Sequence, residues 1–132
     1  MKFTRIALAA AALATATGAL AATNETNAKG EAELAKLIAG RTAGKPVSCI
    51  PAMLSGQNMR IIDRTAIVYD AGSTIYVARP DDPKSLDSDN ILVIDRFGSQ
   101  ICKQDIIRTV NRYSGFMTGV VFLSDFTPYK KP

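Results

Sequence analysis

The chain has 132 residues, 47% of them hydrophobic and 21% charged, and carries a formal net charge of +4. This length predicts one folded domain. The sequence contains no histidine, which excludes Ser-His-Asp and Cys-His hydrolases and most metalloenzymes. Lys2 and Arg5 account for half of the net charge and lie in the leader described next, so the basicity does not predict a nucleic-acid partner.

Residues 1–21 have the pattern of a secretory signal peptide. Lys2 and Arg5 precede an apolar stretch, and Ala19, Leu20 and Ala21 form a cleavage site of the A-x-A type. The alternative is a membrane helix, but the apolar stretch is shorter than the roughly 20 residues that spanning requires, and the small residues that follow it do not suit an anchor. We therefore expect an exported chain, periplasmic or secreted, with no membrane span after cleavage.

The segment 22–44 is expected to be a flexible lead-in that contains a short helix. Residues 23–30 are polar and predict disorder, whereas residues 31–40 (EAELAKLIAG) have apolar positions at helical spacing. Gly40 is a suitable stop for that helix. The remaining segment, 45–132, is expected to form the β domain.

Short runs rich in Ile, Val, Thr and Tyr dominate residues 47–132 and predict strands. The best hairpin joins residues 65–69 to residues 74–78 across an Asp-Ala-Gly-Ser turn. The continuous apolar runs 91–94 (ILVI) and 120–123 (VVFL) are expected in the core. Together these runs predict a mainly β fold, a small antiparallel sheet or barrel of five to six strands with one short N-terminal helix.

Residues 105–113 (DIIRTVNRY) fit either a helix capped by Asp105 or a strand. We interpret them as the first strand of a second hairpin, with residues 114–119 as its connection. The terminal stretch 126–129 (FTPY) places two aromatic residues in an expected loop, where core closure and recognition explain them equally well.

Cys49 and Cys102 are the two cysteines of the chain. An exported protein folds in an oxidising compartment, where paired cysteines normally form a disulfide. A catalytic thiol usually has a neighbouring histidine as base, and a zinc site needs about four ligands. The sequence therefore predicts a disulfide between Cys49 and Cys102, and no cofactor or metal.

The segment 80–90 (PDDPKSLDSDN) is rich in carboxylates that could perform acid–base chemistry or bind a hard cation. Its spacing lacks the glycine and the further oxygen ligand of a calcium loop. Because Pro, Asp, Ser and Asn are also ordinary loop residues, we interpret it as a plain surface connection.

A possible binding patch involves arginines and aromatic residues. If residues 105–113 form a strand, Arg108 and Arg112 share one face, with Tyr76 or Tyr113 beside them and Phe116 in the following loop. The alternative is that the arginines pair with Asp63, Asp95 and Asp105 on a solvated sheet face.

Several stretches together resemble a family of short exported proteobacterial proteins of unknown function. They are residues 47–50, 65–69 and 75–77, the Ile101-Cys102 pair with Asp105, and residues 126–129, so that the resemblance spans about residues 45–129. It implies a bacterial, periplasmic setting and transfers no catalytic role.

The main functional hypothesis is a non-catalytic exported domain that binds a protein or envelope component. An inhibitor of an envelope hydrolase is a sharper form of that hypothesis. The alternatives are a barrel that binds a small anionic or apolar ligand and, least favoured, a carboxylate enzyme built on Asp81, Asp82, Asp87 or Asp89.

Overall fold

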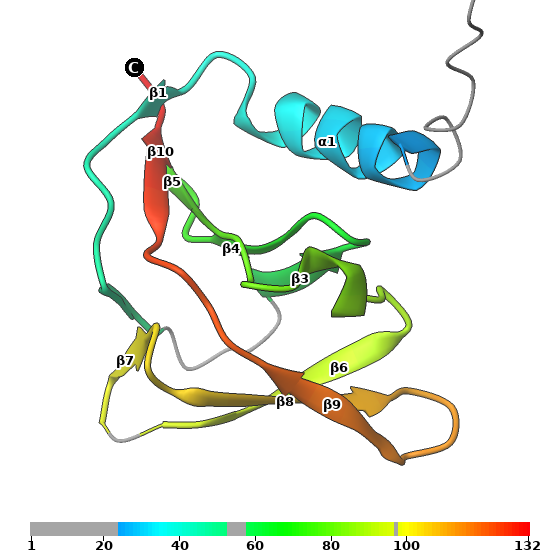
Figure 1. Ribbon diagram of the computed structural model, residues 1–132. Coiled ribbons are helices and arrows are strands. Elements are labelled where there is room, and N and C mark those ends of the chain that lie inside the picture. The colour runs from blue at the N-terminus through cyan, green and yellow to red at the C-terminus, as the bar shows by residue number, and fades with distance from the viewer. Residues whose placement is uncertain (1–23, 53–57, 97) are drawn as a thin grey trace, which may run out of the picture.

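The computed structural model describes residues 24–52, 58–96 and 98–132. It has three layers: one helix, a five-stranded sheet and a three-stranded sheet, with a two-stranded ribbon at one side (Figure 1). The sheets are antiparallel throughout and do not close into a ring. The predicted mainly β fold with one N-terminal helix is confirmed, with the open sheet and not the barrel as its form.

Helix α1 spans Asn24–Ile38, so it begins earlier than the sequence predicted. The expectation of disorder over residues 23–30 is wrong from Asn24 onward. Gly30 explains how this polar turn can pack: it is buried, and a Cβ built on it would lie 2.0 Å from Thr65 Oγ1. The helix ends before Gly40, whose φ of 71° lies in the left-handed region that favours glycine at a helix stop.

The five-stranded sheet has the order β1-β10-β5-β4-β3. Its strands are β1 (Thr42–Ala43), β3 (Met59–Ile62), β4 (Ala66–Asp70), β5 (Thr74–Ala78) and β10 (Thr127–Lys130). The predicted hairpin is the β4–β5 pair, closed by the hydrogen bond from Ala71 N–H to the Thr74 carbonyl oxygen at 2.9 Å. The C-terminal aromatic stretch is strand β10 with Phe126 fully buried before it, so core closure is its role and the expected loop is wrong.

The three-stranded sheet has the order β6-β8-β9, with β6 at Asn90–Asp95, β8 at Ile106–Asn111 and β9 at Met117–Val121. The ambiguous segment 105–113 is therefore a strand, and its hairpin with β9 is confirmed. The ribbon pairs β2 (Cys49–Pro51) with β7 (Gln100–Cys102). A short 3-10 turn, η2 (Pro83–Ser85), lies in the connection between β5 and β6.

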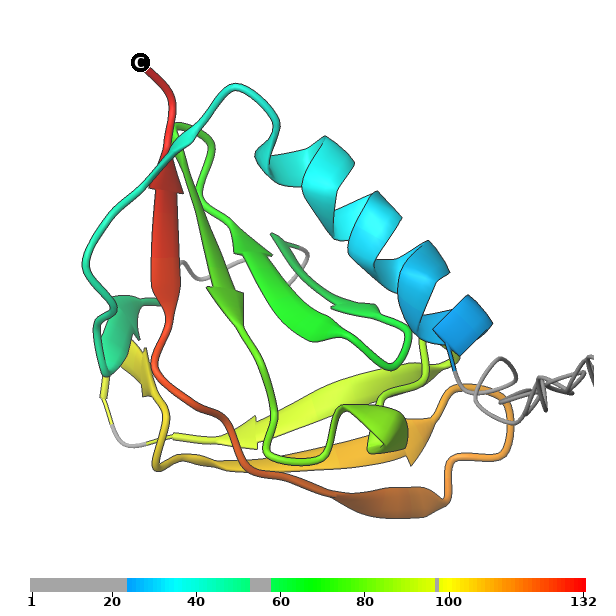
Figure 2. The same ribbon diagram turned by 45° about the horizontal axis from the view of Figure 1, so that its top comes forward.

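Two apolar clusters lie between the layers. The first fills the space between the two larger sheets, where Ile50, Ile67, Leu86, Ile107 and Phe126 are at most 2% exposed. The second lies between α1 and the five-stranded sheet and is centred on Leu34, Val68 and Val77. The helix and the three-stranded sheet thus cover opposite faces of the same sheet, as the turned view shows (Figure 2).

The runs 91–94 and 120–123 are only half buried, which corrects the expectation that both lie wholly in the core. Val121 and Leu123 are buried, but Val120 is 40% and Phe122 64% exposed. Ile91 is likewise 44% exposed. The reason is that the sheet β6-β8-β9 packs on the core through one face only, so alternate residues of each run point away from it.

Among the described residues, no helix combines the length and the apolar character that crossing a membrane requires.

Candidate interaction surface

The face of sheet β6-β8-β9 that points away from the core is mostly apolar. Strand register arranges it in three cross-strand rows: Ile91, Val110 and Met117; Val93, Arg108 and Val120; Asp95, Ile106 and Phe122. Phe122 lies one residue beyond the C-terminal end of β9 and follows Val120 by strand alternation, so the register extended by one step places it beside Ile106. We call these nine residues the outer face. Antiparallel sheets usually carry polar residues on a solvated face, so seven apolar side chains are unusual there.

Arg108 stands at the centre of the outer face. Its Nη2 donates to Asp95 Oδ1 at 2.8 Å, and both side chains remain more than 40% exposed. Its Nε is buried and has no acceptor among the described residues. The pairing confirms the alternative in which this arginine binds a nearby aspartate. The face therefore carries one positive and one negative charge, in contact with each other, within an apolar surround.

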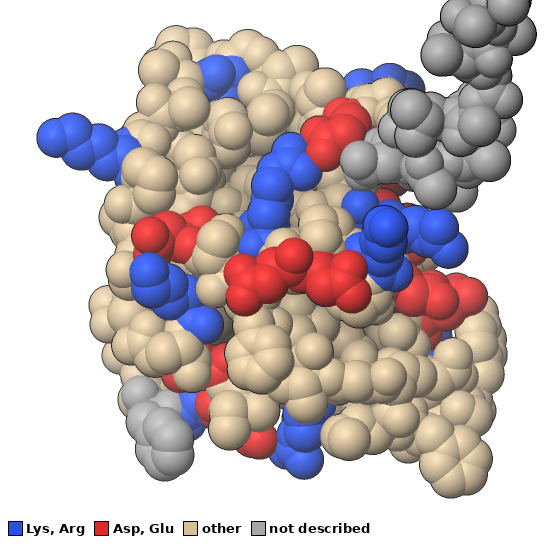
Figure 3. Space-filling view, in the orientation of Figure 1, with Lys and Arg blue, Asp and Glu red and all other residues tan. Residues whose placement is uncertain are grey.

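The β8–β9 turn holds two aromatic side chains in solvent, Tyr113 at 81% and Phe116 at 75% exposure. We call Arg112, Tyr113 and Phe116 the hairpin tip. In both ribbon views this turn stands out at a corner of the molecule (Figures 1 and 2). The space-filling view shows few charged side chains over β9 and this corner (Figure 3).

The turn is held by its own hydrogen bonds. Asn111 Oδ1 accepts from the N–H of Tyr113 at 3.1 Å, the N–H of Ser114 at 2.9 Å and the hydroxyl of Ser114 at 3.1 Å. Asn111 N–H donates to the Phe116 carbonyl oxygen at 2.9 Å, and Gly115, at a φ of 72°, turns the chain. A turn fixed in this way has little backbone conformational entropy left to lose when its aromatic side chains bind a partner.

Of the two other residues predicted for the patch, Arg112 lies at the hairpin tip and Tyr76 lies in another sheet. Arg112 follows the end of β8 at the hairpin tip, and its backbone N–H donates to the Asp89 carbonyl oxygen at 3.0 Å. Tyr76 lies in the five-stranded sheet, partly buried, with its ring centroid 6.3 Å from that of Tyr69. It belongs to the core and not to the surface that carries Arg108 and Tyr113.

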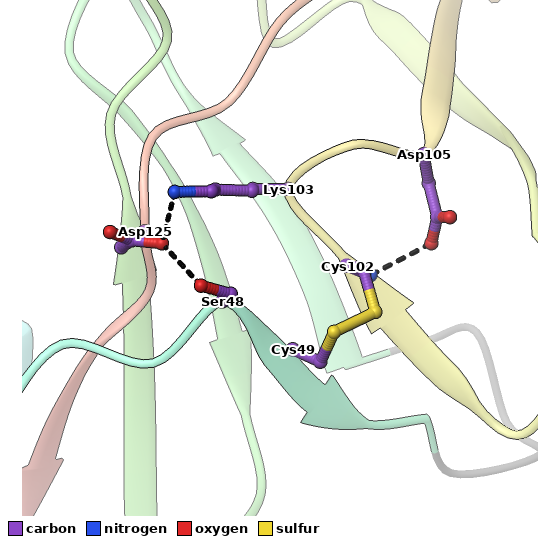
Figure 4. The surroundings of a disulfide bond; sticks show 6 residues. All are labelled: Ser48, Cys49, Cys102, Lys103, Asp105 and Asp125. Atoms are coloured by element: carbon purple, nitrogen blue, oxygen red, sulfur yellow. Dashed lines mark hydrogen bonds and ion pairs between the residues drawn. A yellow bond between two sulfur atoms is a disulfide. The ribbon is translucent and has the colours of Figure 1, made fainter.

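The disulfide between Cys49 and Cys102 is present, as predicted, and joins directly opposite residues of β2 and β7. Three polar contacts surround it (Figure 4). Cys102 N–H donates to Asp105 Oδ2 at 2.7 Å, and Asp125 Oδ1 accepts from Ser48 Oγ at 2.9 Å and pairs with Lys103 Nζ at 2.8 Å. The hydrogen bond from Lys103, and after it the one from Ser48, lower the pKa of the Asp125 carboxyl. These contacts join neighbouring chain segments around the disulfide, so we interpret the two cysteines as a structural cross-link.

Two aspartates of residues 80–90, Asp82 and Asp87, accept hydrogen bonds from backbone groups. Asp82 Oδ1 accepts from Lys84 N–H at the start of η2, and Asp87 Oδ1 accepts from Asp89 N–H at 2.8 Å. Such contacts are those of an ordinary turn-rich connection. Within the described ranges, no three Cys, Asp or Glu side chains gather to hold a metal ion.

A groove of about 190 Å³ lies between α1 and the neighbouring strands β5 and β10. An ion pair spans it: Arg79 Nη1 and Nη2 donate to the two Glu31 oxygens at 2.6 and 2.9 Å. These hydrogen bonds lower the pKa of Glu31 and raise that of Arg79. The pair fixes the helix to the end of β5, so Glu31 and Arg79 already satisfy one another.

Sequence reasoning named the hairpin tip and Arg108 but missed the apolar majority of the outer face. Ile91, Val120 and Phe122 stand within continuous apolar runs that suggest full burial. The neighbouring strands carried a usable signal. Ile106 and Met117 are also apolar and stand at alternate positions of their strands, which indicates an apolar outer face.

Neither a family model nor a curated protein nor a solved structure matches this chain. What its surface binds must follow from its own chemistry.

Proposed function

We propose that the chain is an exported, non-catalytic domain that binds a protein of the cell envelope through its hairpin tip. The observation that carries the proposal is the exposure of Tyr113 and Phe116 on a turn fixed by Asn111. Aromatic residues and arginine are the residues that dominate binding energy at protein interfaces, and Arg112 stands beside the two rings.

The shape of the tip favours insertion into a concave site on the partner. A projecting turn offers its rings on all sides, as inhibitory loops do, and a partner pocket lined by apolar groups would enclose them. A carboxylate at the rim of that pocket would complement Arg112. A hydrolase active-site cleft is one site of this shape, which keeps the inhibitor form of the function as a special case of the same proposal.

Export is the second part of the proposal, and two features support it. The sequence of residues 1–21 has the order of a cleavable leader, and both cysteines of the chain are joined in a disulfide. The resemblance to exported proteobacterial proteins agrees with this setting. Cell fractionation and the mass of the recovered chain test it: we expect the chain outside the cytoplasm, beginning at Ala22, with no thiol that reacts before reduction.

The binding proposal is tested by site-specific photo-crosslinking in cells that export the tagged chain. A photoreactive residue replaces Tyr113 in one variant and Val47 in another, since Val47 is an exposed residue far from the tip in the sequence and lies at the bridge to Phe126. We expect one discrete adduct from position 113 that Phe116→Ala weakens at least tenfold. Adducts of equal yield from both positions, or none from position 113, would contradict the proposal.

A small ligand held between the sheets is not favoured, because the first apolar cluster fills that space with side chains at most 7% exposed. The carboxylate enzyme is also not favoured, since Asp82 and Asp87 accept hydrogen bonds from their own backbone segment. Neither alternative accounts for exposed aromatic residues at the hairpin tip.

A further inference from the structure

The outer face raises a question that binding through the hairpin tip does not answer. The tip is a convex corner, whereas the outer face is a sheet surface whose exposed members include Ile91, Ile106, Met117 and Phe122 at 44, 54, 62 and 64% exposure. Large exposed apolar patches on small proteins mark interaction sites. We propose that the outer face binds the same face of a second copy of this chain and forms a two-fold dimer.

The geometry of the face favours a flat apolar sheet as its occupant. Two sheets pack well when alternate side chains of each interdigitate about 10 Å apart, as in β-sandwiches. The three cross-strand rows supply such side chains from three adjacent strands. The chain thus provides both halves of a sheet-on-sheet contact, since a two-fold interface uses the same surface on both partners.

The charges on the face are self-complementary. Its charged members are Arg108 and Asp95, which are already in contact, so two copies meet without net repulsion. A two-fold axis between the two side chains would bring Arg108 of one copy toward Asp95 of the other. Removing charged groups from water favours their pairing across such an interface.

The available area suits a dimer of moderate affinity. A large apolar side chain can bury on the order of 150–200 Å², and five members of the face expose about half of theirs, so each copy offers roughly 500 Å². Even with the arginine stem, this stays below the roughly 800 Å² per partner of a standard interface and lies at the small end of specific contacts. Interfaces at the low end of this size commonly dissociate in the micromolar range, so we expect concentration-dependent dimerisation.

The outer edge of strand β9 is poorly suited to pair with a strand of another copy, which leaves the outer face as the contact surface. Phe122 O accepts from Asp81 N–H at 3.1 Å, so the chain covers the edge directly after β9. Along β9 itself, the register with β8 shifts between Thr109 and Val110, which interrupts the regular ladder. Bulges of this kind protect a strand edge from pairing with another strand. The face, and not the edge, is therefore the surface offered to the second copy.

Sedimentation velocity of the oxidised mature chain at about 1 to 500 μM tests the proposal. We expect a monomer–dimer equilibrium with a midpoint in the micromolar range. Val120→Asp should leave a monomer throughout, a shift in dissociation constant of at least 100-fold. Val47→Asp is the matched control, because Val47 and Val120 are 38% and 40% exposed and only Val120 lies on the face. It should dimerise as the wild type does.

Three outcomes would overturn the inference. The wild type could remain monomeric up to about 500 μM, or Val120→Asp could dimerise as well as Val47→Asp. The wild type could also be monomeric yet co-sediment with vesicles of phosphatidylethanolamine and phosphatidylglycerol through Val120, in which case the face would be a membrane surface. Circular dichroism of each variant confirms that it folds. Crosslinking from position 113 is read separately, so failure of the dimer leaves the function proposed for the tip standing.

Discussion

Two apolar sheet faces in this molecule differ in burial: one is covered by a helix and the other is exposed. On the five-stranded sheet, Val68 and Val77 point outward from the sandwich and are buried by α1. On the three-stranded sheet, Val120 and Phe122 also point outward, but no described segment of the chain covers them. The two faces have the same residue types, so composition does not decide which is core. The dimer proposed above would bury the second face against a second copy of the chain.

The largest effect we predict comes from the disulfide that joins strands β2 and β7 of the ribbon. Replacing Cys49 and Cys102 with serine should lower the free energy of unfolding by about 4 kcal/mol, the chain-entropy value for a cross-link across a separation of 53 residues. Urea unfolding at pH 7 measures the loss. The reduced wild type should match the double variant, and a loss below about 1 kcal/mol would mean that the ribbon β2–β7 holds without its covalent bond.

A matched pair of truncations compares the covered and uncovered faces directly. Leu34→Ala removes the buried leucine of α1, 4% exposed, and should cost about 2–4 kcal/mol, while alanine keeps the helix propensity. Ile106→Ala, at 54% exposure, should cost less than about 1 kcal/mol in dilute solution. Urea unfolding of both at low micromolar concentration provides the test. Equal losses would show that the outer face is covered within the single chain.

The contact of α1 at Gly30 can be probed by adding one methyl group. A Cβ there would also lie 2.7 Å from the Asp63 carbonyl oxygen, so the helix must move away from the turn before β4. We expect Gly30→Ala to lower the free energy of unfolding by about 1–2 kcal/mol, because overpacking exceeds the gain in helix propensity. Lys29→Ala, at an exposed neighbouring position, should change it by less than about 0.5 kcal/mol.

The smallest effect concerns the ion pair that fixes α1. The hydrogen bonds from Arg79 lower the pKa of Glu31 in the folded chain, so the pair stabilises fully above the unfolded value of about 4.3. The stabilisation is lost as the pH falls through the lower, folded-state pKa. Both side chains are more than 40% exposed, so Glu31→Gln should cost only about 0.5 kcal/mol at pH 7 and nothing near pH 2. If Glu31→Gln still lowered the free energy of unfolding near pH 2, the stabilisation would not come from the charge of Glu31.

Local sequence signals predicted the elements whose structure depends on near neighbours. Turn residues and alternation identified the β4–β5 hairpin, and Gly40 marked the end of α1. The number of cysteines and the expected oxidising compartment predicted the disulfide before any strand register was known. Arg108, Tyr113 and Phe116 were identified as surface residues because the strand interpretation of residues 105–113 was correct.

The misses share one physical cause, which is that burial depends on distant segments. Residues 24–30 are polar and still helical, because a glycine lets that turn approach Thr65. The run 120–123 is apolar throughout, yet only Val121 and Leu123 meet the opposite sheet. Tyr76 was grouped with Arg108 because both are large recognition residues, but sheet order places them in separate layers.

Strand order also sets the timing of folding. The last strand, β10, lies between β1 and β5, so Thr42 pairs with Lys130 across most of the sequence. A chain still being synthesised lacks the only neighbour that the structure gives to β1, and it lacks Phe126 at the centre of the core. Pairings of such sequence separation form slowly, since the loop must close before they contribute. We therefore expect the five-stranded sheet to close only after β10 has been synthesised, so that folding of this sheet follows synthesis of the last strand.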